Sequence, residues 1–181
     1  MFVFKRITEI SKEDFTAFMG KAAETYVEYC ELSEEYIEYF NDPEYCNDIL
    51  YDFYVENFPT YEANNAHGRF FVTMVDDLGH NEKIIGQVTH TKDQIDRDRV
   101  TYYLLPEFRR QGLMGAAYDK FINNIQDSPY TLKTLFAAVN SDNTPSMHFL
   151  LSRGFNYVGF QEDSGYEKDD KKPRHVFTKD L

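Results

Sequence analysis

The segment that most constrains the fold is residues 100–117. A run of β-forming residues stops at Pro106, and a short basic turn then leads into a helix-like segment that starts near Leu113. The first N–H groups of a helix have no intrahelical partner and carry the positive end of its dipole, so they attract phosphate. Gly112 and Gly115 are predicted to let a phosphate approach the backbone closely. The pattern therefore predicts a strand, a pyrophosphate-binding turn and a helix.

The overall composition excludes several classes of partner. A formal net charge of −12 opposes binding to nucleic acid, because phosphates would be repelled. No stretch is long and apolar enough to cross a bilayer, and Met1–Lys5 lacks the apolar core of a signal peptide, so we expect a cytoplasmic protein without a membrane partner. Cys30 and Cys46 are expected to be reduced thiols, and the five histidines are scattered, so we expect no metal site.

The rest of the chain alternates between strand and helix patterns. We expect strands near residues 2–8, 69–75, 83–89, 100–105, 135–139, 155–160 and 175–179. We expect helices over residues 11–30, in two pieces between 33 and 58, from 113 to about 128, and from 143 to 154. The charged stretch 92–99 is expected to be a loop. These elements predict an α/β fold of one domain over residues 1–181, with a mixed sheet and helices on both faces.

Two segments together resemble the GNAT superfamily of acyl-CoA-dependent N-acetyltransferases. The family's pyrophosphate motif is Gln/Arg-x-x-Gly-x-Gly/Ala, and residues 109–114, Arg-Arg-Gln-Gly-Leu-Met, match it except at Met114. A Met there is common in the branch that contains the ribosomal-protein N-terminal acetyltransferases. The second segment, residues 139–155, has an Asn after a strand, a helix, and a closing Gly-Phe; Asn143, Ser146, Phe149 and Gly154–Phe155 fall in register with the family.

The resemblance implies a mostly antiparallel sheet of about seven strands and a coenzyme site. Residues 69–181 would form the coenzyme-binding core, and residues 1–68 the variable, acceptor-side part. In the family, the strand before the phosphate turn splays from its neighbour at a bulge, and the pantetheine arm pairs with the free edge. The residues that the resemblance assigns to acetyl-CoA are Leu104, Leu105, Arg109, Arg110, Gln111, Gly112, Leu113, Met114, Gly115, Asn140, Asn143 and Ser146.

The group that protonates the leaving thiolate differs from the common family pattern. Many members carry a Tyr seven residues after the motif Asn, where this chain has Leu150, which can donate no proton. The ribosomal-protein branch places a Ser three residues after the Asn, and Ser146 stands there, so we expect Ser146 to be the donor to sulfur. The alternatives are that Ser146 is an ordinary first-turn residue of its helix and that Tyr118 supplies the hydroxyl instead of packing in the core.

The general base and the acceptor site are less well defined by the sequence. Candidate bases are Asp98, His90 and Glu107, or a carboxylate of the N-terminal part acting through water. Residues 22–68 contain no Lys or Arg, while carboxylates and tyrosines recur, with Tyr26 and Tyr29 as candidate acceptor contacts. Carboxylates and aromatic faces attract ammonium groups, so we expect a cationic amine acceptor, such as a polyamine, an aminoglycoside-like amine or a basic peptide N-terminus. A solvated acidic face over an aromatic core is the alternative.

The function implied is acetyl transfer from acetyl-CoA to a primary amine by direct attack in a ternary complex. One alternative is a non-catalytic acyl-CoA-binding module, because the usual Tyr and the usual strand Glu are both missing. A nucleotide-binding protein is a third reading, which the lack of a Walker Lys and of Gly-x-Gly-x-x-Gly disfavours. The resemblance leaves a homodimer open, since dimers are common among such proteins.

Overall fold

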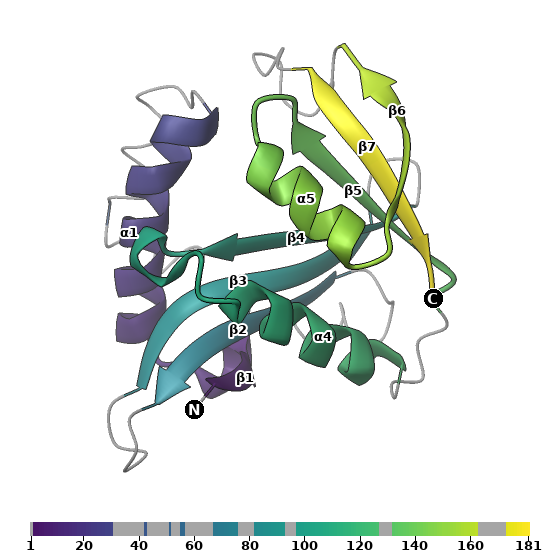
Figure 1. The fold of residues 1–181 in the computed structure, drawn as a ribbon. Coiled ribbons are helices and arrows are strands. Elements are labelled where there is room, and N and C mark those ends of the chain that lie inside the picture. The colour runs from purple at the N-terminus through teal and green to yellow at the C-terminus, as the bar shows by residue number, and fades with distance from the viewer. Residues whose placement is uncertain are drawn as a thin grey trace.

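The computed structural model of the protein describes residues 2–30, 42, 51, 55–56, 67–75, 82–92, 97–126, 132–162 and 173–181 (Figure 1). Its strands are β1 (Phe2–Arg6), β2 (His67–Val75), β3 (Glu82–Lys92), β4 (Asp98–Leu104), β5 (Thr134–Asn140), β6 (Asn156–Gln161) and β7 (Arg174–Asp180). Its longer helices are α1 (Lys12–Cys30), α4 (Leu113–Gln126) and α5 (Thr144–Ser152). Short 3₁₀ turns lie at Ile7–Glu9 and Pro106–Phe108.

One mixed sheet contains strands from both parts of the chain. Its order is β1-β2-β3-β4-β5-β7-β6, and every neighbouring pair is antiparallel except β4 and β5. The prediction of a mixed, mostly antiparallel sheet of about seven strands is thereby confirmed. The predicted loop over residues 92–99 is wrong at both ends, because Lys92 still belongs to β3 and pairs across the ladder with Asp98, the first residue of β4.

Helices cover both faces of the sheet, as predicted. Successive strand side chains point to opposite faces, so two apolar neighbours on one strand can enter two different cores. Ile84 and Leu105 pack in the cluster under α1, whereas Ile85 and Leu104 pack in the cluster under α4 and α5. The α1 cluster also contains Phe15, Phe18 and Ala22, and the other includes Tyr118, Phe121, Leu150 and Phe155.

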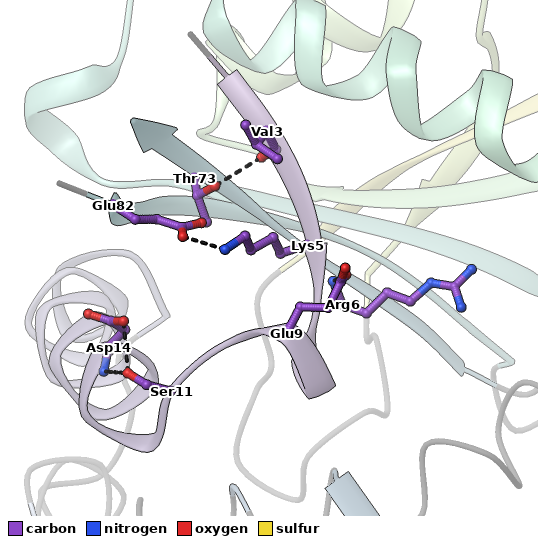
Figure 2. A network of polar contacts seen from close by, with 8 residues as sticks. All are labelled: Val3, Lys5, Arg6, Glu9, Ser11, Asp14, Thr73 and Glu82. Carbon is purple, nitrogen blue, oxygen red and sulfur yellow. Dashed lines mark hydrogen bonds and ion pairs between the residues drawn. The ribbon is translucent and has the colours of Figure 1, made fainter. Parts of the chain in front are cut away.

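Polar contacts attach the N-terminal segment to the sheet and start α1 (Figure 2). Lys5 on β1 forms an ion pair with Glu82 on β3, and the Thr73 hydroxyl donates to the Val3 carbonyl at 3.3 Å. The Ser11 hydroxyl accepts a hydrogen bond from the Asp14 N–H at 3.1 Å, which caps the free N–H groups at the start of α1. The helix that the sequence predicts from Ser11 to Cys30 is thereby confirmed.

Two further properties concern the part of the chain that the structure describes. None of the helices there is both long and apolar enough to span a lipid bilayer. No cluster of three or more His, Cys, Asp or Glu side chains with the geometry of a metal site occurs among the same residues. Most of the helical stretch expected between residues 33 and 58 lies outside the described residues.

Candidate active site

The two central strands β4 and β5 separate soon after they meet. They pair in parallel only at Asp98↔Leu135 and Arg99↔Phe136, although each strand has seven residues. Beyond Arg99 the strands diverge (Figure 1), so β4 from residue 100 onward has no strand partner on its β5 side. We call the wedge between the two strands the splay; its narrow end lies at Asp98 and its open end at Leu104. The splay that the family resemblance implies is therefore present.

The ladder between β3 and β4 determines which backbone groups face the splay. Leu105 N–H donates to the Ile85 carbonyl at 2.9 Å, which makes Gly86↔Leu104 a non-hydrogen-bonded pair. In such a pair the backbone groups point away from the partner strand, so Leu104 and, two residues earlier, Tyr102 direct their N–H and C=O groups toward the splay. Leu105 has no N–H left for a ligand, and Leu104 is the better placed of the two leucines predicted to contact coenzyme.

The bulge near this strand is not where the family pattern suggests. The pairing of β3 with β4 runs without a register shift over the whole of β4. The shift lies on the other side of β3, where Ile85 is an extra residue between the pairs Val72↔Gly86 and Thr73↔Ile84. A Cβ on Gly86 would come within 2.5 Å of the Tyr103 carbonyl oxygen, so a glycine is required for this close approach of the two strands.

The turn between β4 and α4 has the backbone of an anion-binding loop. Arg110 has a φ of 61° and Gly112 a φ of 75°, both left-handed. Such residues direct successive N–H groups toward one concave side. Ala116 N–H makes the first bond of α4, to the Gly112 carbonyl at 3.2 Å, so the N–H groups of Leu113–Gly115 have no partner within the helix. We call residues 110–115 the cradle, and it lies at the open end of the splay.

Gly115 makes room for a neighbouring side chain. A Cβ at this position would lie 2.0 Å from Nη2 of Arg153, which follows α5. Nη1 of Arg153 also donates to both carboxylate oxygens of Asp119 on α4, at 2.9 and 2.7 Å. Arg153 thus brings a guanidinium to the first turn of α4, a contact that the sequence motif does not indicate because the two residues are far apart in the chain.

The side chains of the turn brace it from within. Arg109 Nε donates to the Leu104 carbonyl at 2.9 Å, and its guanidinium lies 5.6 Å from the centre of the Tyr103 ring. Gln111 Nε2 donates to the Glu107 carbonyl at 3.0 Å. Arg110 is exposed. Arg109 and Gln111 therefore shape the turn, whereas Arg110 is an exposed cation of the cradle.

Two of the candidate bases form one pair near the narrow end. His90 Nε2 and Asp98 Oδ1 lie 2.8 Å apart, joining β3 to the start of β4. The His90 side chain is 8% exposed and the Asp98 side chain 15% exposed. Glu107 is exposed at the other end of β4, and a hydrogen bond with its own backbone, with help from Lys83, lowers the pKa of its carboxyl. A lowered pKa makes Glu107 a weaker base, so the pair is the stronger candidate.

A tyrosine that the sequence reasoning did not single out contacts the predicted acid. The hydroxyl oxygen of Tyr102 on β4 lies 2.6 Å from Ser146 Oγ in the first turn of α5. Its ring packs edge-on against Phe149 with the ring centres 4.9 Å apart. Burial raises the pKa of Tyr102 to about 12, although its bond to Ser146 offsets part of the effect. Only the three-dimensional structure shows this contact, because 44 residues separate the two side chains.

The two asparagines assigned to the coenzyme also have structural partners. Asn143 Oδ1 caps α5 by accepting from Ser146 N–H at 3.2 Å, as its position before Pro145 predicts. A cap uses only the side-chain oxygen, so the amide nitrogen can still donate to a ligand. Asn140 Oδ1 accepts from Arg174 Nε at 3.0 Å across the β5–β7 ladder. Coenzyme contacts by either asparagine stay predictions.

The positions of Leu150 and Tyr118 narrow the choice of acid. Leu150 is fully buried in the core under α4 and α5. Tyr118 is 1% exposed, its hydroxyl makes no hydrogen bond among the described residues, and burial raises its pKa. A buried hydroxyl without access to the splay cannot serve a leaving group, so Tyr118 belongs to the core and Ser146 stays the candidate.

The acceptor side is only partly described. Tyr26 and Tyr29 belong to the last turns of α1, and their side chains fall outside the described part of the structure. A depression of about 320 Å³ lies on the sheet beside the narrow end, and Arg97, Lys133 and Asp98 contribute to its lining. The depression carries the Asp98 carboxylate as well as two cations, so its charge does not identify the acceptor site. The acceptor role of Tyr26 and Tyr29 stays a prediction.

Comparison with known proteins agrees with this geometry. The sequence model of the acetyltransferase (GNAT) family matches residues 29–155, which span β2–β5, the cradle and α5. Among curated proteins, no sequence matches the chain.

Solved structures share the fold at low sequence identity. A ribosomal-protein-S5-alanine acetyltransferase from Vibrio fischeri aligns with a TM-score of 0.73 and 20% identity, over 99% of this chain and 92% of its own. RimL, a ribosomal L7/L12 α-N-protein acetyltransferase in complex with coenzyme A, aligns with a TM-score of 0.72 and 11% identity, over 99% of this chain and 94% of its own. The spermidine/spermine N-acetyltransferase SpeG from Vibrio cholerae aligns with a TM-score of 0.65 and 15% identity, over 99% of this chain and 94% of its own.

Proposed function

The chain belongs to the acetyltransferase (GNAT) family, and from this premise we propose that it transfers an acetyl group from acetyl-CoA to a cationic primary amine by direct attack in a ternary complex. It is an N-acetyltransferase, and acetyl-CoA is its acyl donor. The observation that carries the proposal is the splay, where β4 leaves β5 after two paired residues with a phosphate cradle at its open end.

The fit of the coenzyme rests on backbone groups of this chain. The cradle offers the free N–H groups at the start of α4 to the pyrophosphate, with the exposed Arg110 beside them. The edge of β4 offers the backbone groups of Tyr102 and Leu104 to the pantetheine arm, as an added strand would use them. One of these N–H groups would polarise the acetyl carbonyl.

The His90–Asp98 pair is the base that we propose for the incoming amine. An amine attacks only when it is neutral, so its ammonium proton must be removed near the thioester. Asp98 is the more exposed member and would take that proton, directly or through water, while His90 behind it holds the carboxylate in place. Both groups lie by the narrow end, away from the phosphate cradle.

The acceptor class is inferred from the charge of the acidic part of the chain. A stretch without Lys or Arg from residue 22 to 68 carries a dozen carboxylates, which would raise the local concentration of a cation. SpeG, a spermidine/spermine N-acetyltransferase by its name, and the two ribosomal-protein acetyltransferases are similar in fold to this chain. We therefore propose a polyamine or a basic peptide N-terminus as the acceptor. Assembly as a homodimer stays a prediction.

Free-thiol release from acetyl-CoA across a panel of amines tests the function. The panel should contain spermidine, an aminoglycoside, a basic and an acidic peptide of matched length, and a neutral amine. We expect turnover that is fastest with the cationic members. Coenzyme binding without turnover on any amine would instead indicate a non-catalytic acyl-CoA-binding module. A preference for the neutral or acidic members would overturn the acceptor class but leave the reaction type intact.

A further inference from the structure

The hydrogen bond between Tyr102 and Ser146 joins the two sides of the splay. Tyr102 lies on β4 beyond the last residue that pairs with β5, and Ser146 lies in the first turn of α5, the helix that follows β5. Their hydroxyl oxygens are 2.6 Å apart, a normal distance for an O–H···O bond. Both residues lie on the face of the sheet that α5 covers, next to the ring of Phe149.

The chemistry of the two hydroxyls determines the direction of this bond. A phenol is a stronger acid than an aliphatic alcohol and therefore the better donor, while the alcohol oxygen is the better acceptor. The Tyr102 hydroxyl also lies 3.4 Å from the Ser146 carbonyl oxygen, which is again an acceptor. Within the described residues, Tyr102 is the hydrogen-bond partner of Ser146 Oγ. When Tyr102 is the donor, the hydroxyl proton of Ser146 is not used in this bond and can be donated to another acceptor.

We propose that Tyr102 is a positioning residue that holds the Ser146 hydroxyl with its proton directed into the splay, toward the sulfur of the departing coenzyme A. The inference rests on the proposed function, because it assumes that the thioester lies between β4 and α5. Without Tyr102, the serine hydroxyl would be free to turn back toward the carbonyls of the preceding turn, as serines in helices commonly do.

The pair stabilises the thiolate as a hydrogen-bond donor and does not protonate it outright. A thiol has a pKa of about 8.5. The pKa of Tyr102 is about 12 because its partly buried position disfavours the charged phenolate. A full proton transfer from the tyrosine to sulfur is therefore uphill by more than three orders of magnitude, whereas donating a hydrogen bond needs no such transfer.

The overall step balances without any further reactant. The amine nitrogen forms a bond to the acyl carbon, and the bond from that carbon to sulfur breaks with its electron pair on sulfur. The base takes the ammonium proton before the attack and passes it to solvent; the nitrogen then loses a second proton to the base as the amide forms, and sulfur gains one from solvent or from that base, so that one proton is released overall. Ser146 and Tyr102 keep their protons throughout and lower the energy of the sulfur anion while it exists.

The experiment measures the thiol of bound coenzyme A and needs no acceptor. The ultraviolet absorbance of the thiolate, recorded as a difference against the protein with desulfo-coenzyme A, gives the pKa of the bound thiol. Wild type should hold this pKa below that of free coenzyme A. We expect Ser146→Ala to raise it by about one unit and Tyr102→Phe by about half a unit, since a bond to a charged acceptor is worth roughly that much.

Two controls separate positioning from a general effect on structure. Tyr118→Phe removes a buried hydroxyl from the same aromatic cluster without touching Ser146, and it should leave the thiol pKa unchanged. The double variant Tyr102→Phe/Ser146→Ala should match Ser146→Ala alone, because Tyr102 acts through the serine.

Three results would overturn the inference. The first is an unchanged thiol pKa in Tyr102→Phe, and the second is an equal shift in Tyr118→Phe. The third is an additive effect in the double variant. A wild-type protein that binds no coenzyme A is a different result, because it would remove the proposed function and this inference with it.

Discussion

The two ends of the splay differ in the kind of group that lines them, backbone at one end and side chains at the other. The open end offers backbone groups: left-handed residues, a glycine and the first N–H groups of α4. The narrow end and the facing turn of α5 offer side chains from three elements, β3, β4 and α5, in the pairs His90–Asp98 and Tyr102–Ser146. Backbone recognition suits a coenzyme that is the same in every turnover, and side-chain pairs suit proton movements. The comparison predicts that changes at the open end alter binding and changes at the narrow end alter turnover.

The largest effect is expected from Asp98→Asn at the narrow end. The change keeps the shape but removes the charge of the proposed base, so kcat should fall about 100-fold or more, a typical contribution of a general base. The dissociation constant of coenzyme A should stay within about twofold of wild type, because the cradle is untouched. Steady-state kinetics with the fastest amine and calorimetry of coenzyme binding measure the two quantities.

Asp180→Asn is the matched control for Asp98→Asn. It removes a carboxylate from β7, which β5 separates from β4, and Asp180 Oδ1 accepts there from the Thr134 hydroxyl at 2.8 Å. Its kcat should equal that of wild type. Equal losses in the two variants would show that the narrow end has no special role in turnover.

Gly112→Ala at the open end is expected to have a smaller effect, and to weaken coenzyme binding instead of slowing turnover. An alanine is strained at a φ of 75° by about 1–2 kcal/mol, and the turn can relieve that strain only by rotating its N–H groups away. The dissociation constant of acetyl-CoA should rise about tenfold, and kcat at saturating acetyl-CoA should change little.

Gly154→Ala is the control for backbone strain. Gly154 has a φ of 81°, and a Cβ there meets no atom within 4 Å, as at Gly112. Both variants should therefore lose similar stability in thermal unfolding, but only Gly112→Ala should lose coenzyme affinity. A tenfold loss in both would mean that the cradle is not the coenzyme site.

Much of the open end can be predicted from sequence, and little of the narrow end. The cradle depends on φ angles and on helix N-termini, which a fixed spacing such as Arg109-x-x-Gly112 encodes locally. The caps at Ser11 and Asn143 and the stop at Gly154 were predictable for the same reason.

The His90–Asp98 and Tyr102–Ser146 pairs join residues that lie on different elements of the fold, so no local spacing reports them. The sequence indicates His90 and Asp98 as separate candidates, but only the antiparallel register of β3 and β4 shows them as one pair. The sequence also places Asp98 in a loop, because a run of charges between two strands has the composition of one. The partner of Ser146 depends on how α5 folds back over β4.

The smallest effect concerns alkaline stability. An unfolded tyrosine loses its proton near pH 10, whereas the pKa of folded Tyr102 is about 12. Between these values the unfolded chain binds fewer protons than the folded one, so the free energy of unfolding falls as pH rises. Tyr102 should contribute about 1 kcal/mol of this loss by pH 11, and urea unfolding of Tyr102→Phe should lack that part.

Tyr157→Phe is the matched control for the alkaline measurement. Tyr157 is 51% exposed on β6, so its hydroxyl remains in contact with water after folding. Because it removes an exposed hydroxyl, this variant measures how far the loss of a phenol by itself changes urea unfolding at high pH. A loss in Tyr102→Phe that is as steep as in wild type would show that Tyr102 does not lie in the buried environment described above.

The central claim is that the coenzyme pairs with the free edge of β4, and amide hydrogen exchange followed residue by residue tests it most directly. Adding coenzyme A should slow exchange at Tyr102 and Leu104, whose N–H groups face the splay. Exchange at Tyr103 and Leu105 should change little, because the ladder already bonds their N–H groups to β3. This alternation is the predicted result. Protection that is equal at all four residues, or absent at Tyr102 and Leu104, would contradict it.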